Sequence, residues 1–257
     1  MTSAAGADTD DVVWCERRGP EGRIAEVVLN RPERRNALTG PLASTLADLL
    51  ERLGADETVT VVLLRGAGDA FCSGLDLKEF AADPRPGWVA SFGDEWRRAH
   101  RALFDLPAVV VGALQRAAVN GGAALALGCD FLVAGDEAFL QVGEVQQGMA
   151  APMNTAWLML RHPESVVARV ALLGDRLHGP ELVELGLANR SVPDDQVLDA
   201  ARELADRLAG HDPAGVRRIK RALRRTGPAT SAEEWFARPL EVDGLDRPIR
   251  PIAAVDR

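Results

Sequence analysis

Residues 59–74 read Val-Thr-Val-Val-Leu-Leu-Arg-Gly-Ala-Gly-Asp-Ala-Phe-Cys-Ser-Gly, a run of apolar residues that gives way to glycine. The valines and leucines of residues 59–64 predict a strand covered on both faces, which is typical of an α/β layer architecture. Gly66, Gly68 and Gly74 follow one another too closely for regular structure. The stretch therefore predicts a buried strand that ends in a glycine-rich loop.

Further strands and helices are predicted on both sides of this loop. Upstream, residues 24–29 suit a strand closed by Pro32, and leucines at the helical period behind Pro41 predict an amphipathic helix through Leu53. Downstream of the loop we expect a helix at 88–106, a buried strand at 108–113, a glycine-opened helix at 123–128, a short strand at 131–134, and helices at 163–173, 180–185, 194–208 and 213–225. From Thr226 onward the sequence predicts no particular helix or strand.

The composition narrows the class of protein. The 257 residues contain 38 acidic and 30 basic side chains, and the net charge of −8 argues against a nucleic-acid partner. Cys15, Cys72 and Cys129 lack paired metal-ligand spacing and are interpreted as reduced thiols. The longest apolar runs are shorter than the ~20 residues of a membrane helix. We expect a cytoplasmic protein without a membrane segment, with residues 1–11 as a disordered tail.

Three segments together resemble the crotonase, or enoyl-CoA hydratase/isomerase, superfamily. They are Val-Leu-Asn-Arg-Pro-Glu-Arg-Arg-Asn-Ala-Leu at 28–38, Ala-Phe-Cys-Ser-Gly-Leu-Asp-Leu-Lys-Glu at 70–79, and Gly-Gly-Ala-Ala-Leu-Ala-Leu-Gly-Cys-Asp-Phe at 121–131. The resemblance implies an α/β spiral of strand-strand-helix turns, followed by helices that mediate trimers, often paired into hexamers. We accordingly expect a crotonase-like core at 12–192 and a helical oligomerisation region at 193–257.

The resemblance also implies an oxyanion hole, in which two backbone N–H groups stabilise negative charge on a thioester oxygen. The first donor falls on Leu75, after Gly74, and the second on Gly121, beside Gly122. Glycine suits this task because it lets the main chain approach an oxygen closely. The family's usual triple glycine reads Asn-Gly-Gly here, starting at Asn120.

The two carboxylates of the family's hydratases map differently onto this chain. The first maps to Ala124, which cannot transfer a proton, and the second maps to Glu144. One well-placed base is enough to move a proton between carbons. We therefore expect an enoyl-CoA isomerase that uses Glu144, binds no permanent cofactor or metal, and takes a coenzyme A thioester as substrate. Asp76, Leu77 and Lys78 are predicted contacts of the CoA moiety.

Other functions stay open at this stage. A hydratase could use Asp136 or Glu137 as a second acid, or work slowly with Glu144 alone. Thioester hydrolysis and decarboxylation would use the same oxyanion hole, because it accepts any enolate or tetrahedral oxyanion. Loss of one family glutamate also leaves room for a non-catalytic acyl-CoA binder.

Three further patterns allow two readings each. The basic run at 217–225 could hold CoA phosphates or form a solvated helix face, and the second is favoured. Trp88, Phe92 and Trp96 could line an acyl channel or belong to the core. Cys72 stands beside the predicted oxyanion loop, but without an adjacent base it is interpreted as structural rather than as a nucleophile.

Overall fold

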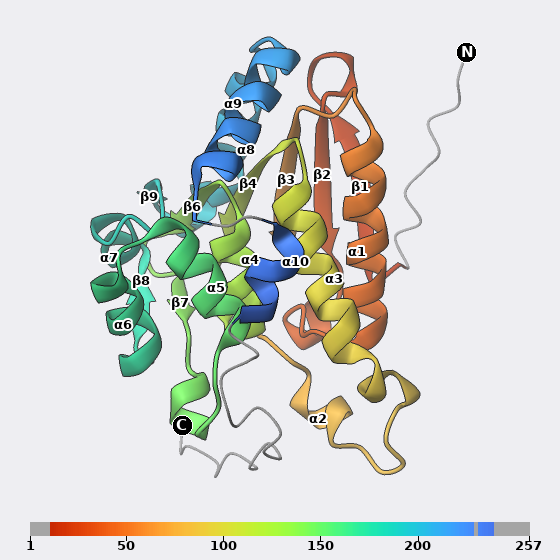
Figure 1. Cartoon of the computed structure of the whole chain (residues 1–257), viewed down its shortest axis with the longest axis vertical. Helices are drawn as coiled ribbons and strands as arrows, with labels where there is room; N and C mark the ends of the chain where they lie inside the picture. The colour runs from red at the N-terminus through yellow and green to blue at the C-terminus, as the bar shows by residue number, and fades with distance from the viewer. Residues whose placement is uncertain (1–10, 229–230, 239–257) are drawn as a thin grey trace.

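A computed structural model of the chain describes residues 11–228 and 231–238 (Figure 1). The predicted tail at 1–11 lies outside this part except for Asp11, and so does the end of the chain from residue 239. The strands form a larger sheet in the order β1-β2-β3-β4-β6-β9 and a smaller sheet in the order β5-β7-β8. Their bounds are β1 Val13–Arg18, β2 Ile24–Leu29, β3 Val61–Gly66, β4 Val109–Leu114, β5 Ala117–Val119, β6 Phe131–Gly135, β7 Phe139–Gln141, β8 Arg176–His178 and β9 Arg190–Val192.

The larger sheet is parallel except at its first edge, where β1 runs antiparallel to β2. The predicted strand at 24–29 is confirmed as β2. The strand predicted at 59–64 begins later, at Val61, which pairs with Ile24. The strand starts later because a turn precedes it. The N–H of Val59 donates to the carbonyl of Asp56 in this turn and therefore makes no hydrogen bond to a neighbouring strand.

Ten α-helices are found in the described part of the chain. The first, α1, begins behind Thr39, whose side chain accepts from the N–H of Leu42 and caps the helix. The helices are α1 Gly40–Ala55, α2 Leu77–Phe80, α3 Phe92–Asp105, α4 Gly121–Gly128, α5 Pro152–Arg161, α6 Glu164–Leu173, α7 Gly179–Glu184, α8 Val197–Ala209, α9 Pro213–Thr226 and α10 Ala232–Ala237.

The chain repeats one unit along its length: a strand in the larger sheet, a piece of the smaller sheet, and then a helix. In one repeat β4 is followed by β5 and α4, and in the next β6 is followed by β7 and, after a short turn, α5. Isolated bridges from Leu38 to Leu75 and from Cys72 to Ala118 provide the corresponding piece in the earlier repeats. The predicted spiral of strand-strand-helix turns is therefore confirmed.

Helices cover both faces of the larger sheet. On one face α1 and α3 lie side by side, and α10 lies across α3 and α5 (Figure 1). On the other face α8 contacts β3, β4 and β6 through small side chains, among them Ala201 and Ala205. Because α8 packs on its own chain's sheet, part of the predicted oligomerisation region contributes to the core. The division at residues 192 and 193 otherwise stays a prediction.

The helix predicted at 88–106 is divided in the structure. A 3-10 turn at Gly87–Ala90 ends at Ser91, and α3 then runs to Asp105. The side chain of Trp88 lies against Gly40, where a Cβ atom would come within 2.4 Å of it. Packing of the indole on α1 explains the separate turn. None of the helices among residues 11–228 and 231–238 is long and apolar enough to cross a membrane.

A buried ion cluster around Asp130 fixes α9 to the core. The Asp130 carboxylate lies 2.7 Å from the Lys220 ammonium and 2.8 Å from the Arg224 guanidinium, and it accepts from the N–H of Val110 at 2.8 Å. Arg161 completes the cluster at 3.4 Å. Burial alone would raise the pKa of Asp130, but the three cations lower it to about 2. The carboxylate therefore compensates a Lys220 side chain that is only 5% exposed.

We expect Asp130→Asn to lower the free energy of unfolding at pH 7 by about 3 kcal/mol, because Lys220 would remain buried without its counter-charge. Glu203→Gln is the control, since it removes an exposed ion pair with Arg190 and should cost less than ~1 kcal/mol. Urea denaturation measures both. Equal losses in the two variants would contradict the stabilising role of the cluster.

The Asp130 contribution also has a defined pH range. The folded-state pKa is depressed, so the stabilisation is fully present above the unfolded value of about 3.9 and is lost as the pH falls through the folded value of about 2. The difference in stability between the wild-type chain and Asp130→Asn should accordingly shrink below pH 4.

Candidate active site

The loop after β3 carries the first predicted oxyanion donor. Gly74 has φ +85°, and a Cβ atom there would lie 2.7 Å from the carbonyl oxygen of Val119. In the β-bridge between Leu38 and Leu75, the N–H of Leu38 donates to the carbonyl of Gly74, and the N–H of Asp76 donates to the carbonyl of Leu38. This pattern leaves the N–H of Leu75 outside the bridge, where it is available to a ligand.

The start of α4 carries the second predicted donor. Gly121 is the first helical residue, so its N–H has no partner within the helix. At Gly122 a Cβ atom would lie 2.2 Å from the carbonyl oxygen of Cys72. The two glycine-containing segments therefore touch backbone to backbone, an approach that a larger residue at 122 would prevent.

Asn120 replaces the first residue of the family's usual triple glycine and still takes a glycine-like conformation, with φ +51° and ψ −112°. Asparagine tolerates positive φ better than most residues. Its side-chain oxygen accepts from the N–H of Gly143 at 2.8 Å, and its own N–H donates to the carbonyl of Gln141 at 2.8 Å. These bonds stabilise the turn that precedes Gly121.

A cavity of about 320 Å³ joins the two donors and the predicted base. Leu75, Gly121 and Glu144 all line it, and so does Ala124, where the hydratases have their other carboxylate. Glu144 is the only charged side chain in the lining, within the described residues. The complete lining is Leu38, Ser73, Leu75, Leu77, Phe92, Trp96, Val119, Asn120, Gly121, Ala124, Glu144, Gln147, Met149, Ala150, Ala151, Pro152, Met153 and Asn154.

Glu144 opens the 3-10 turn Glu144–Gln147 and is 8% exposed. Its Oε1 accepts from the Nδ2 of Asn154 at 2.9 Å, while Oε2 is buried without a hydrogen-bond partner in the described part of the chain. Burial raises the pKa of Glu144 to about 7, against the lowering effect of its own backbone N–H and of Asn154. A carboxyl group with this pKa can both accept and donate a proton near neutrality.

The remaining predicted contacts are divided between the cavity and its surroundings. Leu77 lines the cavity, and Lys78 is exposed on α2. The Asp76 carboxylate is buried, pairs with Arg34 at 2.8 Å and with Arg31 at 3.2 Å, and caps α2. Asp76 thus holds the loop through its own chain, and its backbone is engaged as well, because its N–H donates to the carbonyl of Leu38 and its carbonyl accepts from the N–H of Phe80. These binding roles stay predictions.

Two of the three aromatic candidates lie in the cavity wall. Phe92 and Trp96 line it with nearly parallel rings, whose centroids lie 6.1 Å apart. Trp88 lies outside the lining and donates from its indole N–H to Glu79. An acyl group in this cavity would therefore contact Phe92 and Trp96.

Other reactive side chains are not arranged for chemistry. Burial raises the pKa of the Cys72 thiol to about 12, which suits a structural residue. Burial lowers the pKa of His100 to about 3, and its Nδ1 accepts from the indole of Trp157. Asp136 accepts from Ser191 outside the cavity, and Glu137 is exposed. Among the described residues, no group of three His, Cys, Asp or Glu side chains could hold a metal ion.

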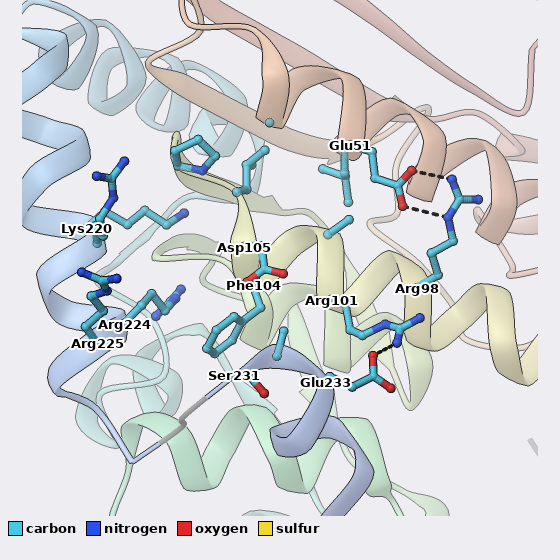
Figure 2. A pocket seen from close by; sticks show the side chains of 17 residues that line it. Glu51, Arg98, Arg101, Phe104, Asp105, Lys220, Arg224, Arg225, Ser231 and Glu233 are labelled. Carbon is cyan, nitrogen blue, oxygen red and sulfur yellow. Dashed lines mark hydrogen bonds and ion pairs between the residues drawn. The ribbon is translucent and has the colours of Figure 1, made fainter.

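The basic run at 217–225 lies on α9 and is only partly a solvated face. Figure 2 shows Lys220, Arg224 and Arg225 along one side of a second cavity, of about 980 Å³, between α1, α3, α9 and α10. Lys220 and Arg224 are held by Asp130, and Arg217 donates to the carbonyl of Val59. Several of these cations therefore attach α9 to the core, and this cavity shares no lining residue with the first.

Comparison with known proteins shows the family to which the chain belongs. The family model described as enoyl-CoA hydratase/isomerase matches residues 19–238. The chain belongs to the enoyl-CoA hydratase/isomerase family. As a member of this family, it is an acyl-CoA enzyme whose fold combines two mixed sheets with C-terminal helices.

Individual members of the enoyl-CoA hydratase/isomerase family differ in their named reactions. Carnitinyl-CoA dehydratase of Proteus mirabilis is 33% identical over 84% of this chain and 82% of its own length. The 1,2-epoxyphenylacetyl-CoA isomerase of Escherichia coli is 33% identical over 79% of each chain. The crystal structure of a monofunctional enoyl CoA isomerase from M. smegmatis has a TM-score of 0.70 at 31% identity, and covers 88% of this chain and 98% of its own.

Asn154 was missed by the sequence analysis, although it lines the cavity and contacts Glu144. The available signal was a lone amide in the otherwise largely apolar stretch that begins at Pro152. Such a residue in a buried helix needs hydrogen-bond partners, which sequence alone does not identify.

We expect Gly74→Ala to lower kcat/KM for an acyl-CoA substrate by about 10²-fold, because the Cβ atom would displace the Leu75 N–H from its place beside Gly121. Gly93→Ala on α3 is the matched control, since nothing lies within 4 Å of a Cβ atom there. Steady-state kinetics and thermal unfolding of both variants check this. Full activity in a folded Gly74→Ala protein would remove Leu75 from the oxyanion hole.

Proposed function

We propose that the chain is an enoyl-CoA isomerase that moves a double bond by proton transfer through Glu144. The observation that carries this proposal is that Glu144 is the only carboxylate in the described lining of the cavity, with Ala124 at the other family position. A single carboxylate suits transfer of one proton between two carbons. Addition of water, in contrast, uses a second group to hold and polarise the water.

The reaction can be written with all atoms balanced. The ionised carboxylate of Glu144 removes a proton from C2 of a 3-enoyl thioester, and the electron pair passes to the carbonyl oxygen. The N–H groups of Leu75 and Gly121 stabilise this dienolate. Glu144 then returns the same proton to C4, which leaves the double bond between C2 and C3 and restores the carboxylate.

The geometry supports each step of this scheme. Oε1 of Glu144 accepts a hydrogen bond from Asn154, whereas Oε2 has no partner among the described residues and is the oxygen left to take up the proton. Phe92 and Trp96 give the cavity an apolar wall section against which the acyl chain can pack. The isomerase names of the Escherichia coli and M. smegmatis relatives are compatible with this chemistry.

Hydration is the second candidate, and one observation favours it. Oδ1 of Asn154 is buried without a hydrogen-bond partner in the described residues, so two acceptors, this oxygen and Oε2 of Glu144, belong to side chains of the same cavity. Each of these oxygens could accept a hydrogen bond from a water molecule. The earlier alternative of Asp136 or Glu137 as second acid is weaker, because neither lines the cavity.

We expect Glu144→Gln to lower kcat for isomerisation of 3-hexenoyl-CoA by about 10²- to 10⁴-fold, since glutamine cannot accept the C2 proton. For the unchanged enzyme, kcat/KM should rise with pH through an apparent pKa near 7, because only the ionised carboxylate is a base. Undiminished turnover by Glu144→Gln would refute the assignment.

The same assay with other thioesters separates the alternatives. Hydration of crotonyl-CoA without isomerisation of 3-hexenoyl-CoA would favour the hydratase. Release of free CoA would favour hydrolysis, and loss of carbon dioxide from a malonyl-type thioester would favour decarboxylation. Binding of all these ligands without turnover would favour a non-catalytic acyl-CoA binder.

We also propose a homotrimer or a dimer of trimers. Ile219 and Leu223 support this, because they are 66% and 65% exposed one turn apart on α9, and exposed apolar side chains that cluster mark contact surfaces. Sedimentation velocity should give a mass of three or six chains, about three or six times 27.5 kDa. A monomer at micromolar concentration would contradict the proposal.

A further inference from the structure

Asn154 on α5 links the predicted base to the predicted oxyanion hole through a single nitrogen. Its Nδ2 donates to Oε1 of Glu144 at 2.9 Å and to the backbone carbonyl of Asn120 at 3.1 Å. The side chain is 2% exposed, so these bonds are shielded from water. An amide nitrogen has two hydrogens, and both are used here.

The bond to Asn120 acts on the peptide unit that contains the N–H of Gly121. In a planar trans peptide the carbonyl of one residue and the N–H of the next point in opposite directions. The Asn120 carbonyl accepts from both Asn154 and the N–H of Ala124, the latter at 3.0 Å. Two donors that fix this carbonyl therefore also fix the direction of the Gly121 N–H.

The bond to Glu144 acts on the carboxylate. With Oε1 held, rotation of the carboxyl group is restricted and Oε2 remains as the unpartnered oxygen. A second connection joins the same segments, because the Asn120 side chain accepts from the N–H of Gly143, directly before Glu144. Base and donor are thus connected through side chain and main chain.

We propose that Asn154 is a positioning residue that fixes the catalytic carboxylate of Glu144 and the oxyanion donor of Gly121 relative to each other. This inference rests on the proposed function, in which Glu144 is the base. Hydrogen bonding to a carboxylate favours its charged form, so Asn154 also keeps the pKa of Glu144 lower than burial alone would set it.

Among the residues that the structure describes, the cavity lining contains no other charged side chain that could compete with this effect. The remaining lining side chains, including those of Ser73 and Gln147, are neutral. The helix α6, which packs on the turn of Glu144, carries Glu164 and Arg169 at exposed positions outside the lining. A change in the apparent pKa in Asn154→Ala, which introduces no new charge, therefore reports on the bond from Asn154 to Glu144.

Two variants test the proposal against a neighbouring control. Asn154→Ala removes both hydrogen bonds, and Asn154→Asp keeps the shape of the side chain but replaces the donor by a carboxylate. Thr155→Ala, the next residue on α5 and outside the lining, is the control. We expect Asn154→Ala to lower kcat by about 10²-fold with a smaller change in KM, because a misplaced base loses near-attack geometry.

The pH profile distinguishes positioning from packing. The limb of kcat/KM that reports ionisation of Glu144 should move to higher pH in Asn154→Ala, and further in Asn154→Asp, where two carboxyl groups would share the site. Thr155→Ala should keep the wild-type profile. Titration of the Glu144 carboxyl carbon by ¹³C NMR, assigned with Glu144→Gln, should show the same order of pKa values without any turnover.

The outcomes separate this inference from the proposed function. If Glu144→Gln is inactive and Asn154→Ala keeps the wild-type kcat, pH profile and NMR titration, the positioning role is wrong while the base assignment stands. If Glu144→Gln is fully active, the proposed function itself fails. If Asn154→Ala is too unstable to purify, Asn154→Asp decides the question by its kcat on the high-pH plateau, where Glu144 is ionised, because aspartate keeps the shape of asparagine but lacks the donor; a wild-type plateau there would also contradict the positioning role.

Discussion

The structure depends on the close approach of two backbone segments, the loop after β3 and the start of α4. Gly122 lies against the carbonyl of Cys72, and Gly74 lies against the carbonyl of Val119, so neither position has room for a side chain. This contact brings Leu75 and Gly121, which carry the predicted donors, to one cavity. The surrounding sheets and helices supply the rigidity that keeps such backbone donors aligned without a ligand.

Around this contact, the chain builds a cavity of uneven polarity. Most of the wall is apolar, and the charge is confined to Glu144, whose desolvation makes it a better base. The same burial leaves polar atoms without partners, which a folded chain keeps only at some cost. Unsatisfied oxygens of Glu144 and Asn154 in one cavity are thus consistent with a site that is completed by a substrate.

Sequence reasoning predicted the parts of the fold that follow from strong local patterns. The apolar run of β2, the leucine period of α1 and the glycine start of α4 have clear signatures, and all three elements are found. Strands β5, β7 and β8 have three residues each, too few to show alternation, so they were not predicted. The helix α10 was missed because Trp235 and Phe236 are buried by α3 and α5, which are distant in sequence.

The candidate site, like the fold, was predicted only in part from the sequence. Leu75, Gly121 and Glu144 could be named from motif positions, and the structure places all three on one cavity. The role of Asn120 as a turn stabiliser and the contacts of Asn154 depend on residues 10 to 34 positions away, which no local pattern encodes. For Asp76, the motif position predicted a contact with the ligand but gave no indication that its carboxylate pairs with Arg31 and Arg34.

Because burial raises the pKa of Glu144 to about 7, the resting protein near neutrality contains both the ionised and the protonated form of this carboxyl group. In the proposed reaction only the ionised form can receive a proton from a thioester. Both directions start from this form, because a 3-enoyl thioester loses its proton from C2, a 2-enoyl thioester loses one from C4, and both give the same dienolate. The direction of net conversion is then set by the relative amounts of the two thioesters.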